Sequence, residues 1–420
     1  MPLTSSSDGR PALSTALTAA ERKVVGLLAL VQFVNVLDFM MVMPLGPDFS
    51  RDLGIDTSQL GMIGGSYTAA AAVSGLISAF VIDRFARKKA LISVLTGLAF
   101  ATLAGAFATG IGSLLAARVV AGAFGGPATA LALAIVADSV PISKRGRALG
   151  IVMGAFSIAS IVGVPAGLEL ARLGSWRTPF LGVGLLALAT VAGAQVFMAD
   201  LPRAPQRMGL SLARLREQFR EPDHLLSVAI GVCVMFSSFV VVPNVATYIQ
   251  RNLAYPRERI GLMYLSGGLA SLVSMQLAGR ATDRSGARTT CVVGTGIAAV
   301  ALYFGFARHH PWFHPILIVT LFMAGTSVRA IAYNTLTSRV PSPSERGSFM
   351  AIQSTVQHLA SACGAFVSST LLTSDGGGRL VGFERVAGLA IGLCVCVPVL
   401  VAILERRLDG RTVEPASDHA

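Results

Sequence analysis

Charged residues are scarce in this chain. Asp, Glu, Lys and Arg make up 13% of its 420 residues, whereas they make up about 25% of an ordinary soluble domain. Apolar residues account for 53%, and the 44 glycines and 19 prolines stand among leucine, alanine and valine, as they do in close-packed membrane helices. This composition excludes a soluble, a collagenous and a disordered chain, and it indicates a membrane protein.

Cysteine is rare as well, and two chemical motifs are missing. The five cysteines all lie inside apolar runs: Cys233, Cys291, Cys363, Cys394 and Cys396. No histidine pair stands at metal-ligand spacing, so neither a zinc site nor a disulfide framework is indicated, and we interpret the cysteines as packing residues. The ATP-binding sequence Gly-x4-Gly-Lys-Ser/Thr is absent too, which excludes a self-powered pump. We expect no metal, no cofactor and no enzymatic activity.

Long apolar runs dominate what is present. Runs of about 18 to 25 residues can each cross a hydrocarbon core about 30 Å thick, and twelve such runs occur along the chain. They begin near Val24, Ser58, Ala90, Ser113, Ala148, Thr178, Leu226, Ile260, Thr290, Pro315, Ser348 and Val386. The sequence therefore predicts an all-α polytopic membrane protein with twelve transmembrane helices.

The basic residues are distributed unevenly between the connections. A net charge of +12 could by itself suit a nucleic-acid-binding protein. If the N-terminus is cytoplasmic, however, 23 of the 34 Lys and Arg fall inside, nine fall outside, and Arg118 and Arg329 fall within membrane segments. This asymmetry follows the positive-inside rule, so we expect both termini in the cytoplasm and no nucleic-acid partner. The segment from Pro2 to Ala20 is too polar for a cleavable signal peptide.

The chain contains two halves that repeat each other at an offset near 200 residues. Asp83-Arg84 reappears as Asp283-Arg284, and Val140-Pro141 reappears as Val340-Pro341. We expect an N-terminal tail over 1–22, a six-helix half over 23–200, a linker over 201–224, a second six-helix half over 225–405 and a tail over 406–420. Two parallel six-helix repeats are a transporter architecture, with the substrate site between the pseudo-symmetric halves near the bilayer midplane.

The linker between the halves carries five arginines. Four apolar residues recur among them at helix-like spacing: Leu210, Leu212, Leu215 and Phe219. This pattern is typical of an amphipathic segment that lies on the inner leaflet. A solvated linker is the alternative.

Three motifs carry a family resemblance. The connection after the second run has Asp83 and Arg84 followed by Phe85-Ala86-Arg87-Lys88; the fourth run has Arg118, Gly122, Gly125 and Gly126; and the fifth has Gly150, Gly154, Gly163, Pro165 and Gly167. With these motifs the chain resembles, from about residue 22 to 407, the major facilitator superfamily and its twelve-helix drug:proton antiporter group. Two departures stand out: Ala79 and Ala86 replace the glycines of the loop signature, and Val164 separates the adjacent Gly-Pro of the fifth run. The resemblance implies a bacterial inner-membrane transporter that is functional as a monomer.

The charges of the loop signature suggest a cytoplasmic gate. Asp83 at a tight turn can accept from free backbone N–H groups near Ser348, where a helix dipole favours an anion. Arg87 can pair with Asp138 at the cytoplasmic end of the fourth run. We expect such contacts, together with Arg84, to latch the halves on the inner side. The alternative is that the basic residues of this loop only anchor the topology.

The glycines of the fifth run form two pairs with a spacing of four residues. Gly150 with Gly154 and Gly163 with Gly167 each permit close approach of another helix. In a straight helix the two pairs point to opposite sides, and we expect Pro165 to bend the helix. A hinge or seal against proton leak and simple helix packing are both open.

An acidic residue inside a membrane segment suggests function by default. Asp38 lies on a polar stripe with Gln32 and Asn35 in the first run. At 1.5 Å per residue, Asp38 lies about 21 Å from the inner face of the membrane, and Arg118 lies about 9 Å below the outer face. In a hydrocarbon core about 30 Å thick, these two positions are at the same depth. We therefore expect an Asp38–Arg118 pair. Burial disfavours the charged carboxylate and the guanidinium favours it, so opening a cavity changes its proton affinity; a permanent structural pair is the alternative.

Further polar residues in the second half suggest a substrate cavity. Arg329 has no carboxylate in the membrane segments of its own half to pair with, and it shares a helix face with Thr326 and Tyr333, so it either lines the cavity or snorkels to the interface. Two more stripes have the same character, and they comprise Ser237, Asn244 and Tyr248, and Gln353, Gln357 and Ser361. We interpret His358 as a packing histidine. With Asn35, these residues are the predicted cavity.

These features predict a secondary transporter that works by alternating access between its two halves. We expect it to exchange inward proton flow for export of a small organic compound such as a drug. The alternative within transport is a sugar, nucleoside or metabolite exporter or facilitator of the same fold. A polytopic membrane enzyme or sensor is the alternative of another class, and it needs a catalytic cluster or a soluble domain that the sequence lacks.

Overall fold

The computed structural model describes residues 17–81, 85–199, 220–342 and 346–413. In the N-terminal half the helices are α1 (Ala19–Met40), α2 (Gly46–Leu53), α3 (Leu60–Val81), α4 (Arg87–Ala106), α5 (Ile111–Ser139), α6 (Ile142–Ile158), α7 (Val164–Leu173) and α8 (Arg177–Phe197). In the C-terminal half they are α10 (Pro222–Phe239), α11 (Val245–Arg251), α12 (Ile260–Leu302), α13 (Pro315–Thr337), α14 (Arg346–Leu371) and α15 (Phe383–Val413). Asp83, Arg84 and the predicted amphipathic part of the linker lie outside the described residues.

Short helical turns and one hairpin complete the described chain. The turns are η1 (Met43–Leu45), η2 (Thr57–Gln59), η5 (Val242–Asn244) and η6 (Arg257–Arg259), and the π-helical turns are η4 (Ala159–Gly163) and η7 (Tyr303–Ala307). Strands β1 (Thr373–Ser374) and β2 (Leu380–Val381) pair antiparallel.

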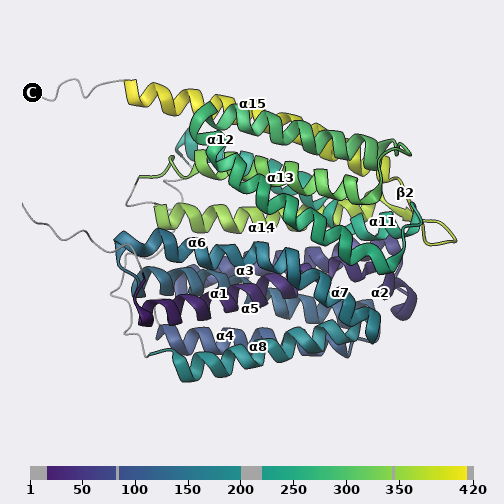
Figure 1. Cartoon of the computed structure of the whole chain (residues 1–420), viewed down its shortest axis with the longest axis horizontal. Coiled ribbons are helices and arrows are strands. Elements are labelled where there is room, and N and C mark those ends of the chain that lie inside the picture. Colours follow the sequence, from purple (N-terminus) through teal and green to yellow (C-terminus); the bar gives the residue numbers. More distant parts are fainter. Residues whose placement is uncertain (1–16, 82–84, 200–219, 343–345, 414–420) are drawn as a thin grey trace, which may run out of the picture.

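The helices lie side by side along the long axis, with α1–α8 in one layer and α10–α15 in the other (Figure 1). The described chain begins and finishes at one end of this bundle, which we call the termini end. The short helices α2 and α11 and the hairpin lie at the opposite end, which we call the far end (Figure 1). The arrangement is that of the two predicted helical halves.

The described helices agree with the predicted membrane spans. Ten helical segments among them are long and apolar enough to cross a membrane. The segment 257–307 holds two of the predicted runs, because α12 is interrupted at Gly286, whose φ is +83°. The 26 residues of α14 form a further long helix. With the two arms of α12 and with α14, the described helices match the twelve predicted runs one for one.

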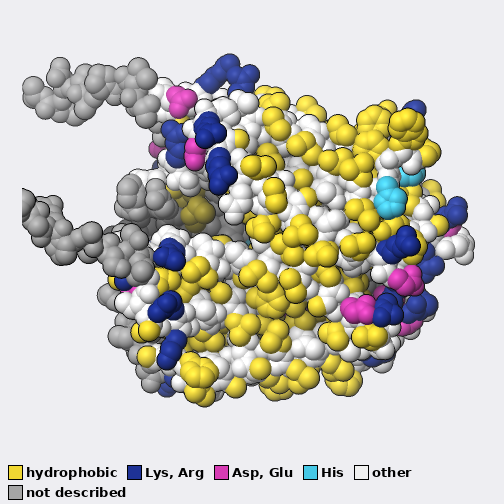
Figure 2. Space-filling model, in the orientation of Figure 1, with side chains coloured by type: hydrophobic (Ala, Val, Ile, Leu, Met, Phe, Trp, Pro, Cys, Tyr) yellow, Lys and Arg dark blue, Asp and Glu magenta, His cyan; other side chains and the backbone are white. Residues whose placement is uncertain are grey.

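The surface of the bundle is that of a membrane protein. Hydrophobic side chains cover its flank, whereas the charged side chains gather at the two ends (Figure 2). Large apolar residues are exposed along this flank, for example Val73, Leu185 and Val399. A flank of this kind faces lipid rather than water, so the chain is a multi-pass membrane protein.

Side-chain caps set several helix ends at the termini end. Thr18 and Glu21 form a reciprocal capping box at the start of α1, in which each side chain accepts from the backbone N–H of the other residue. At the end of α5, Arg145 donates to the carbonyl oxygen of Ala137 at 2.5 Å, and a cation there is favoured by the helix dipole. The dipeptide Arg145-Gly146 reappears in the second half as Arg346-Gly347.

The glycines of α5 allow it to lie directly on α3. A Cβ atom added at Gly122 would lie 2.2 Å from the carbonyl oxygen of Tyr67, and one added at Gly126 would lie 2.5 Å from that of Ala71. A Cβ at Gly125 would lie 2.0 Å from the Tyr67 hydroxyl. Such approaches are possible only for glycine, so the glycine-rich stretch of the fourth run is a packing surface.

The fifth predicted run is a continuous but irregular helix. The turn η4 contains a hydrogen bond from the N–H of Val164 to the carbonyl oxygen of Ala159, five residues back, directly before Pro165. Such π turns often mark functional sites in helices. Gly163 packs on α1, since an added Cβ would lie 2.8 Å from Leu37.

The other predicted glycine contacts of this run are weaker or missing. An added Cβ at Gly167 would make only an ordinary 3.7 Å contact with Met41. At Gly150 and Gly154 it would meet nothing within 4 Å, so the expectation of close approach there was wrong. These two glycines lie in α6, before the π turn.

Candidate functional site

An ion pair links α1 and α5 in the interior of the N-terminal half. Arg118 donates from Nη1 to both carboxylate oxygens of Asp38, at 3.2 and 3.1 Å. Thr102 of α4 donates to Oδ1 of Asp38 at 2.7 Å. The side chains of Asp38 and Arg118 are 0% and 1% exposed, so the structure brings together two residues that lie 80 positions apart in the sequence. Removal of either partner leaves an uncompensated buried charge.

Tyr67 of α3 connects this pair to a second polar group. The Arg118 guanidinium lies 4.6 Å from the centre of the Tyr67 ring, a cation–π contact. The Tyr67 hydroxyl donates to Asn35 at 2.9 Å, and Asn35 donates to the Gly125 carbonyl at 3.1 Å and to Thr129 at 2.9 Å. Asn35 is therefore fully engaged beside the pair. Within the described part of the chain, the Nε and Nη2 atoms of Arg118 have no hydrogen-bond acceptor.

The predicted Arg87–Asp138 contact forms at the termini end. Arg87 donates from Nε to Asp138 at 3.0 Å. The Arg87 side chain is almost fully buried, and that of Asp138 is mostly buried. Arg87 begins α4 and Asp138 lies near the end of α5, so both belong to the N-terminal half. The expectation that this contact joins the two halves was wrong, because the pair fixes one half internally. Asp83 and Arg84, the other predicted gate residues, lie outside the described residues.

Polar contacts that join described residues of the two halves lie at the far end. Asp48 of α2 accepts from Arg257 of η6 at 2.9 Å, and its other oxygen accepts from Arg51 of its own helix at 3.2 Å. Thr57 donates to Ser374 of the hairpin at 2.9 Å. We call Asp48, Arg51 and Arg257 the far-end clasp. No sequence pattern indicated it, since the two partners stand on connections 209 positions apart.

Close backbone packing reinforces this closure of the far end. An added Cβ at Gly61 of α3 would lie 2.5 Å from the carbonyl oxygen of Ala365 of α14. At Gly268 of α12 it would lie 3.0 Å from Ile161 in η4. The irregular turn of the fifth run therefore lies at the boundary between the halves. At the termini end, Figure 2 shows apolar side chains that are recessed between the charged residues of the upper and lower layers.

Arg329 is the buried cation of the C-terminal half. It donates from Nη1 to Cys394 of α15 at 2.6 Å and from Nη2 to Ser238 of α10 at 3.0 Å. The residue is fully buried, so the alternative that it snorkels to the interface is wrong. Ser238 stands 200 positions after Asp38. The second half thus has a neutral hydroxyl where the first half has the carboxylate.

A neutral network lies next to this arginine. The Tyr333 hydroxyl of α13 accepts from Gln357 of α14 at 2.8 Å and from Gln353 of the same helix. Tyr333 and Gln353 are buried, and Oε1 of Gln353 lacks a hydrogen-bond donor within the ranges that the structure covers. Three predicted cavity residues are thereby brought together in one amide–phenol cluster.

The remaining predicted cavity residues divide between two places. Ser237 donates to the carbonyl oxygen of Val234 in its own helix at 3.1 Å, and the same oxygen accepts from Arg329 at 3.4 Å. Asn244 donates to Ser368 of α14 at 3.0 Å, and the Tyr248 ring packs 4.4 Å from the ring of Phe383, centre to centre. The structure does not bring Asn244 and Tyr248 to Arg329, because η5 interrupts the helix after Ser237 and rotates the second part.

Aromatic rings meet at the centre of the boundary between the halves. The ring of Phe39 in α1 lies 6.0 Å from that of Phe239 in α10 and 5.2 Å from that of Tyr67. Phe39 directly follows Asp38, and Phe239 directly follows Ser238. The two halves therefore present equivalent aromatic residues to each other. The 200-residue offset in the sequence indicates this equivalence, but the polar stripes do not include these residues.

Comparison with known proteins gives one consistent family. The family model of the Major Facilitator Superfamily matches residues 28–223 and 227–419. A chloramphenicol resistance protein of Streptomyces lividans is 26% identical over 86% of this chain and 91% of its own length. The multi-drug resistance efflux pump PmrA of Streptococcus pneumoniae is 26% identical over 73% of this chain and 79% of its own length.

Solved structures show the same fold at low sequence identity. A bacterial homologue of the human lysosomal transporter Spinster, in an inward-facing and unoccupied conformation, has a TM-score of 0.75 at 14% identity and covers 96% of this chain and 100% of its own. A D-xylose-proton symporter has a TM-score of 0.70 at 18% identity, with 91% and 96% covered. The family match extends over both halves of the chain, which therefore belongs to the Major Facilitator Superfamily of secondary transporters.

Proposed function

We propose that this transporter is a proton-coupled exporter of small organic compounds, with Asp38 and Arg118 as its coupling pair. In this proposal it lies in the bacterial inner membrane with both termini in the cytoplasm, as the distribution of basic residues favours. It works as a monomer with protons and a small organic substrate as its partners. The fully buried Asp38–Arg118 contact is the observation on which the proposal rests.

The geometry around Asp38 suits reversible protonation. The ionised carboxylate accepts three hydrogen bonds, two from Arg118 and one from Thr102. Protonation turns one of these oxygens into a donor, which removes the charge that holds Arg118 in place. Because the guanidinium also lies over the Tyr67 ring, the cation–π contact remains as an interaction for Arg118 once the carboxylate is neutral. A proton on Asp38 thereby loosens the contact between α1 and α5.

The driving force is the proton gradient. A proton that moves inward across 100 mV supplies about 2.3 kcal/mol. In alternating access, this energy biases the equilibrium between a state open at the termini end and a state open at the far end. The clasp at the far end and the hollow at the termini end support a state open toward the cytoplasm in this conformation.

Aromatic and neutral polar groups favour an amphipathic organic substrate. Phe39, Phe239 and Tyr67 offer ring faces at the boundary between the halves, and the Tyr333 cluster offers neutral hydrogen-bonding groups. Two relatives are named for chloramphenicol resistance and multi-drug efflux, which supports export of compounds of this kind. A sugar, nucleoside or metabolite exporter is the competing assignment within the fold, and a membrane enzyme or sensor has no supporting observation.

The test is the Asp38→Asn variant in proteoliposomes. It retains the size of the side chain and removes the titratable group, so uphill efflux driven by a pH gradient should be lost while downhill exchange of substrate persists. Substrate addition should move protons in the wild type and not in the variant. Asp223→Asn is the matched control, because Asp223 is also buried and paired, with Arg407 at 2.8 Å, but lies at the termini end of α10.

The outcomes separate the alternatives. Undiminished proton-driven transport by Asp38→Asn contradicts the proposal and shifts the assignment to Asp48, Asp138 or His358. A substrate screen with aromatic cationic dyes, chloramphenicol, a hexose and a nucleoside distinguishes the drug exporter from the metabolite exporter. Transport of only the hexose or the nucleoside would favour the second.

A further inference from the structure

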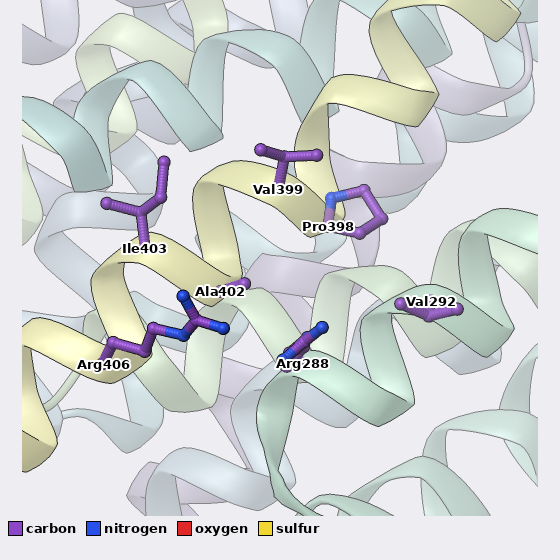
Figure 3. A pocket seen from close by; sticks show the side chains of 7 residues that line it. All are labelled: Arg288, Val292, Pro398, Val399, Ala402, Ile403 and Arg406. Atoms are coloured by element: carbon purple, nitrogen blue, oxygen red, sulfur yellow. The ribbon is translucent and has the colours of Figure 1, made fainter.

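A groove on the outer flank of the C-terminal half combines apolar walls with two arginines. It lies between the second arm of α12 and α15 and has a volume of about 320 Å³. Five of its seven lining residues are apolar, and they are Val292, Pro398, Val399, Ala402 and Ile403. The arginines, Arg288 and Arg406, lie at one end of the groove, with Val292 and Pro398 at the other (Figure 3).

The groove opens toward lipid and not toward the boundary between the halves. Val292, Val399 and Ile403 are exposed large hydrophobic residues, with Val399 58% exposed. Pro398 lies inside α15, where it removes a helical hydrogen bond and favours a bend. The site is therefore distinct from the Asp38–Arg118 pair and from the Tyr333 cluster.

The two arginines mark the edge of the hydrocarbon core. The sequence carries no charge from 289 to 307 or from 386 to 404, and each stretch spans about 28 Å as a helix, close to the thickness of the core. Arg288 and Arg406 stand directly beyond these stretches on the side of the termini end. This is the level at which phospholipid phosphates lie.

Neither guanidinium has an acidic partner in the described ranges of the chain. The carboxylate of Glu405, which directly precedes Arg406, accepts from the backbone N–H groups of Ala287 at 2.8 Å and Arg288 at 3.3 Å. It thereby caps the helical arm that begins after Gly286, whose φ of +83° allows the chain to turn there. The cap fixes α12 against α15, so the groove is preformed and its two cations remain available.

We propose that this groove binds one anionic phospholipid of the leaflet at the termini end. The phosphate lies between Arg288 and Arg406, which offer fork-shaped donors suited to phosphate, and an acyl chain lies along Val292, Val399 and Ile403. A free anion from water would satisfy the arginines but leave these walls unused. A zwitterionic lipid would bring a cationic headgroup next to two guanidiniums. The combination of charge and apolar length therefore selects an anionic lipid.

Native mass spectrometry of the full-length protein tests the proposal, with phosphatidylglycerol and phosphatidylcholine added to detergent solution. We expect one tightly held phosphatidylglycerol in the wild type. The double variant Arg288→Gln with Arg406→Gln should bind it about 30-fold more weakly, because each basic residue near the surface contributes about 1 kcal/mol and 1.4 kcal/mol is tenfold. The matched control is Arg22→Gln with Arg280→Gln, which removes two exposed arginines at the same end.

Two further measurements address the chain and the headgroup separately. Ala402→Phe fills the groove and leaves both arginines in place, so it should weaken binding of phosphatidylglycerol as well. Free glycerol phosphate at millimolar concentration should not displace the lipid, since it lacks the acyl chain. Equal affinity for the two lipids, equal binding by wild type and the double variant, or displacement by glycerol phosphate would each overturn the proposal. Melting curves of every variant verify that the protein is folded.

Discussion

The far-end clasp predicts how the two halves separate. Arg257 and Arg51 both donate to Asp48, one to each carboxylate oxygen, but only Arg257 comes from the other half. The Arg257→Gln variant therefore removes an ion pair that exists only when the far end is closed. Arg51→Gln removes an ion pair that lies within α2 and is present in both states. Each variant removes one positive charge that pairs with Asp48, so each controls for the other.

The burial of the partners gives the magnitude. The Asp48 side chain is 3% exposed, whereas those of Arg257 and Arg51 are 29% and 60% exposed. A surface pair contributes about 0–1 kcal/mol, and breaking a fully buried pair costs about 3–5 kcal/mol. The clasp lies between these limits, because Asp48 is buried but keeps Arg51 after the substitution. We expect about 1.4 kcal/mol, which corresponds to a tenfold shift toward the state that is open at the far end.

Double electron–electron resonance spectroscopy can measure this shift. Spin labels at Gln59 of η2 and His309 after η7 report the separation of the two halves at the far end in a cysteine-free background. In Arg257→Gln the ratio of long to short distances should rise about tenfold, and in Arg51→Gln it should stay within about twofold. The reasoning is refuted if Arg257→Gln leaves the distances unchanged, or if both variants produce the same shift.

Two further substitutions test the packing and polar contacts of the N-terminal half. Gly125→Ala places a Cβ 2.0 Å from the Tyr67 hydroxyl and should lower the free energy of unfolding by about 1–3 kcal/mol, as measured by thermal unfolding. Gly150→Ala is the control, because its Cβ meets nothing within 4 Å and should not destabilise the protein. Equal melting temperatures for the two variants would contradict this reasoning. Thr102→Val removes the 2.7 Å hydrogen bond that helps to hold the Asp38 carboxylate, so proton-driven efflux in proteoliposomes should slow. Thr190→Val, whose hydroxyl donates only to its own helix, should leave the rate unchanged, and an equal loss in both variants would contradict the role of Thr102.

The helices were predictable because span length and hydropathy are properties of single segments. The Asp38–Arg118 contact was predictable for a related reason. A count of residues from each membrane face gave both side chains the same depth, and a buried charge needs a partner. Both inferences use only the bilayer thickness and the helical rise. They did not require knowledge of which helices are neighbours.

Predictions that extended a helical stripe across an irregular turn failed. The stripe from Ser237 to Tyr248 assumed one straight helix, but α10 ends at Phe239 and η5 changes the phase before α11 begins. A periodicity of 3.6 residues places side chains on one face only while the helix is regular, so residues beyond such turns need the structure.

The far-end clasp and the outer groove could not be predicted from either kind of pattern. Asp48 and Arg257 belong to separate halves, and each looks like an ordinary charge on a connection. Arg288 and Arg406 count equally well as topology signals under the positive-inside rule. What distinguishes them is the packing of α12 against α15, which Glu405 fixes through its contacts with the backbone. A cap between two segments 118 positions apart leaves no periodic signature.

The two halves differ chemically at the position where they should be equivalent. Asp38 gives the first half a carboxylate beside Arg118, and Ser238, which stands 200 positions after Asp38, accepts a hydrogen bond from Arg329 in the second half, although Arg329 itself stands 211 positions after Arg118. A serine hydroxyl cannot take up the role of a titratable carboxylate, so under the proposed mechanism Ser238 does not carry a proton as Asp38 does. The Nε atom of Arg329 has no hydrogen-bond acceptor within the described ranges, so this arginine can favour electron-rich or anionic groups of a substrate. Because α1 and α10 present Phe39 and Phe239 to each other directly after these residues, with the ring centres 6.0 Å apart, a substrate that separated the two rings would lie between the Asp38 side of the first half and the Arg329 side of the second.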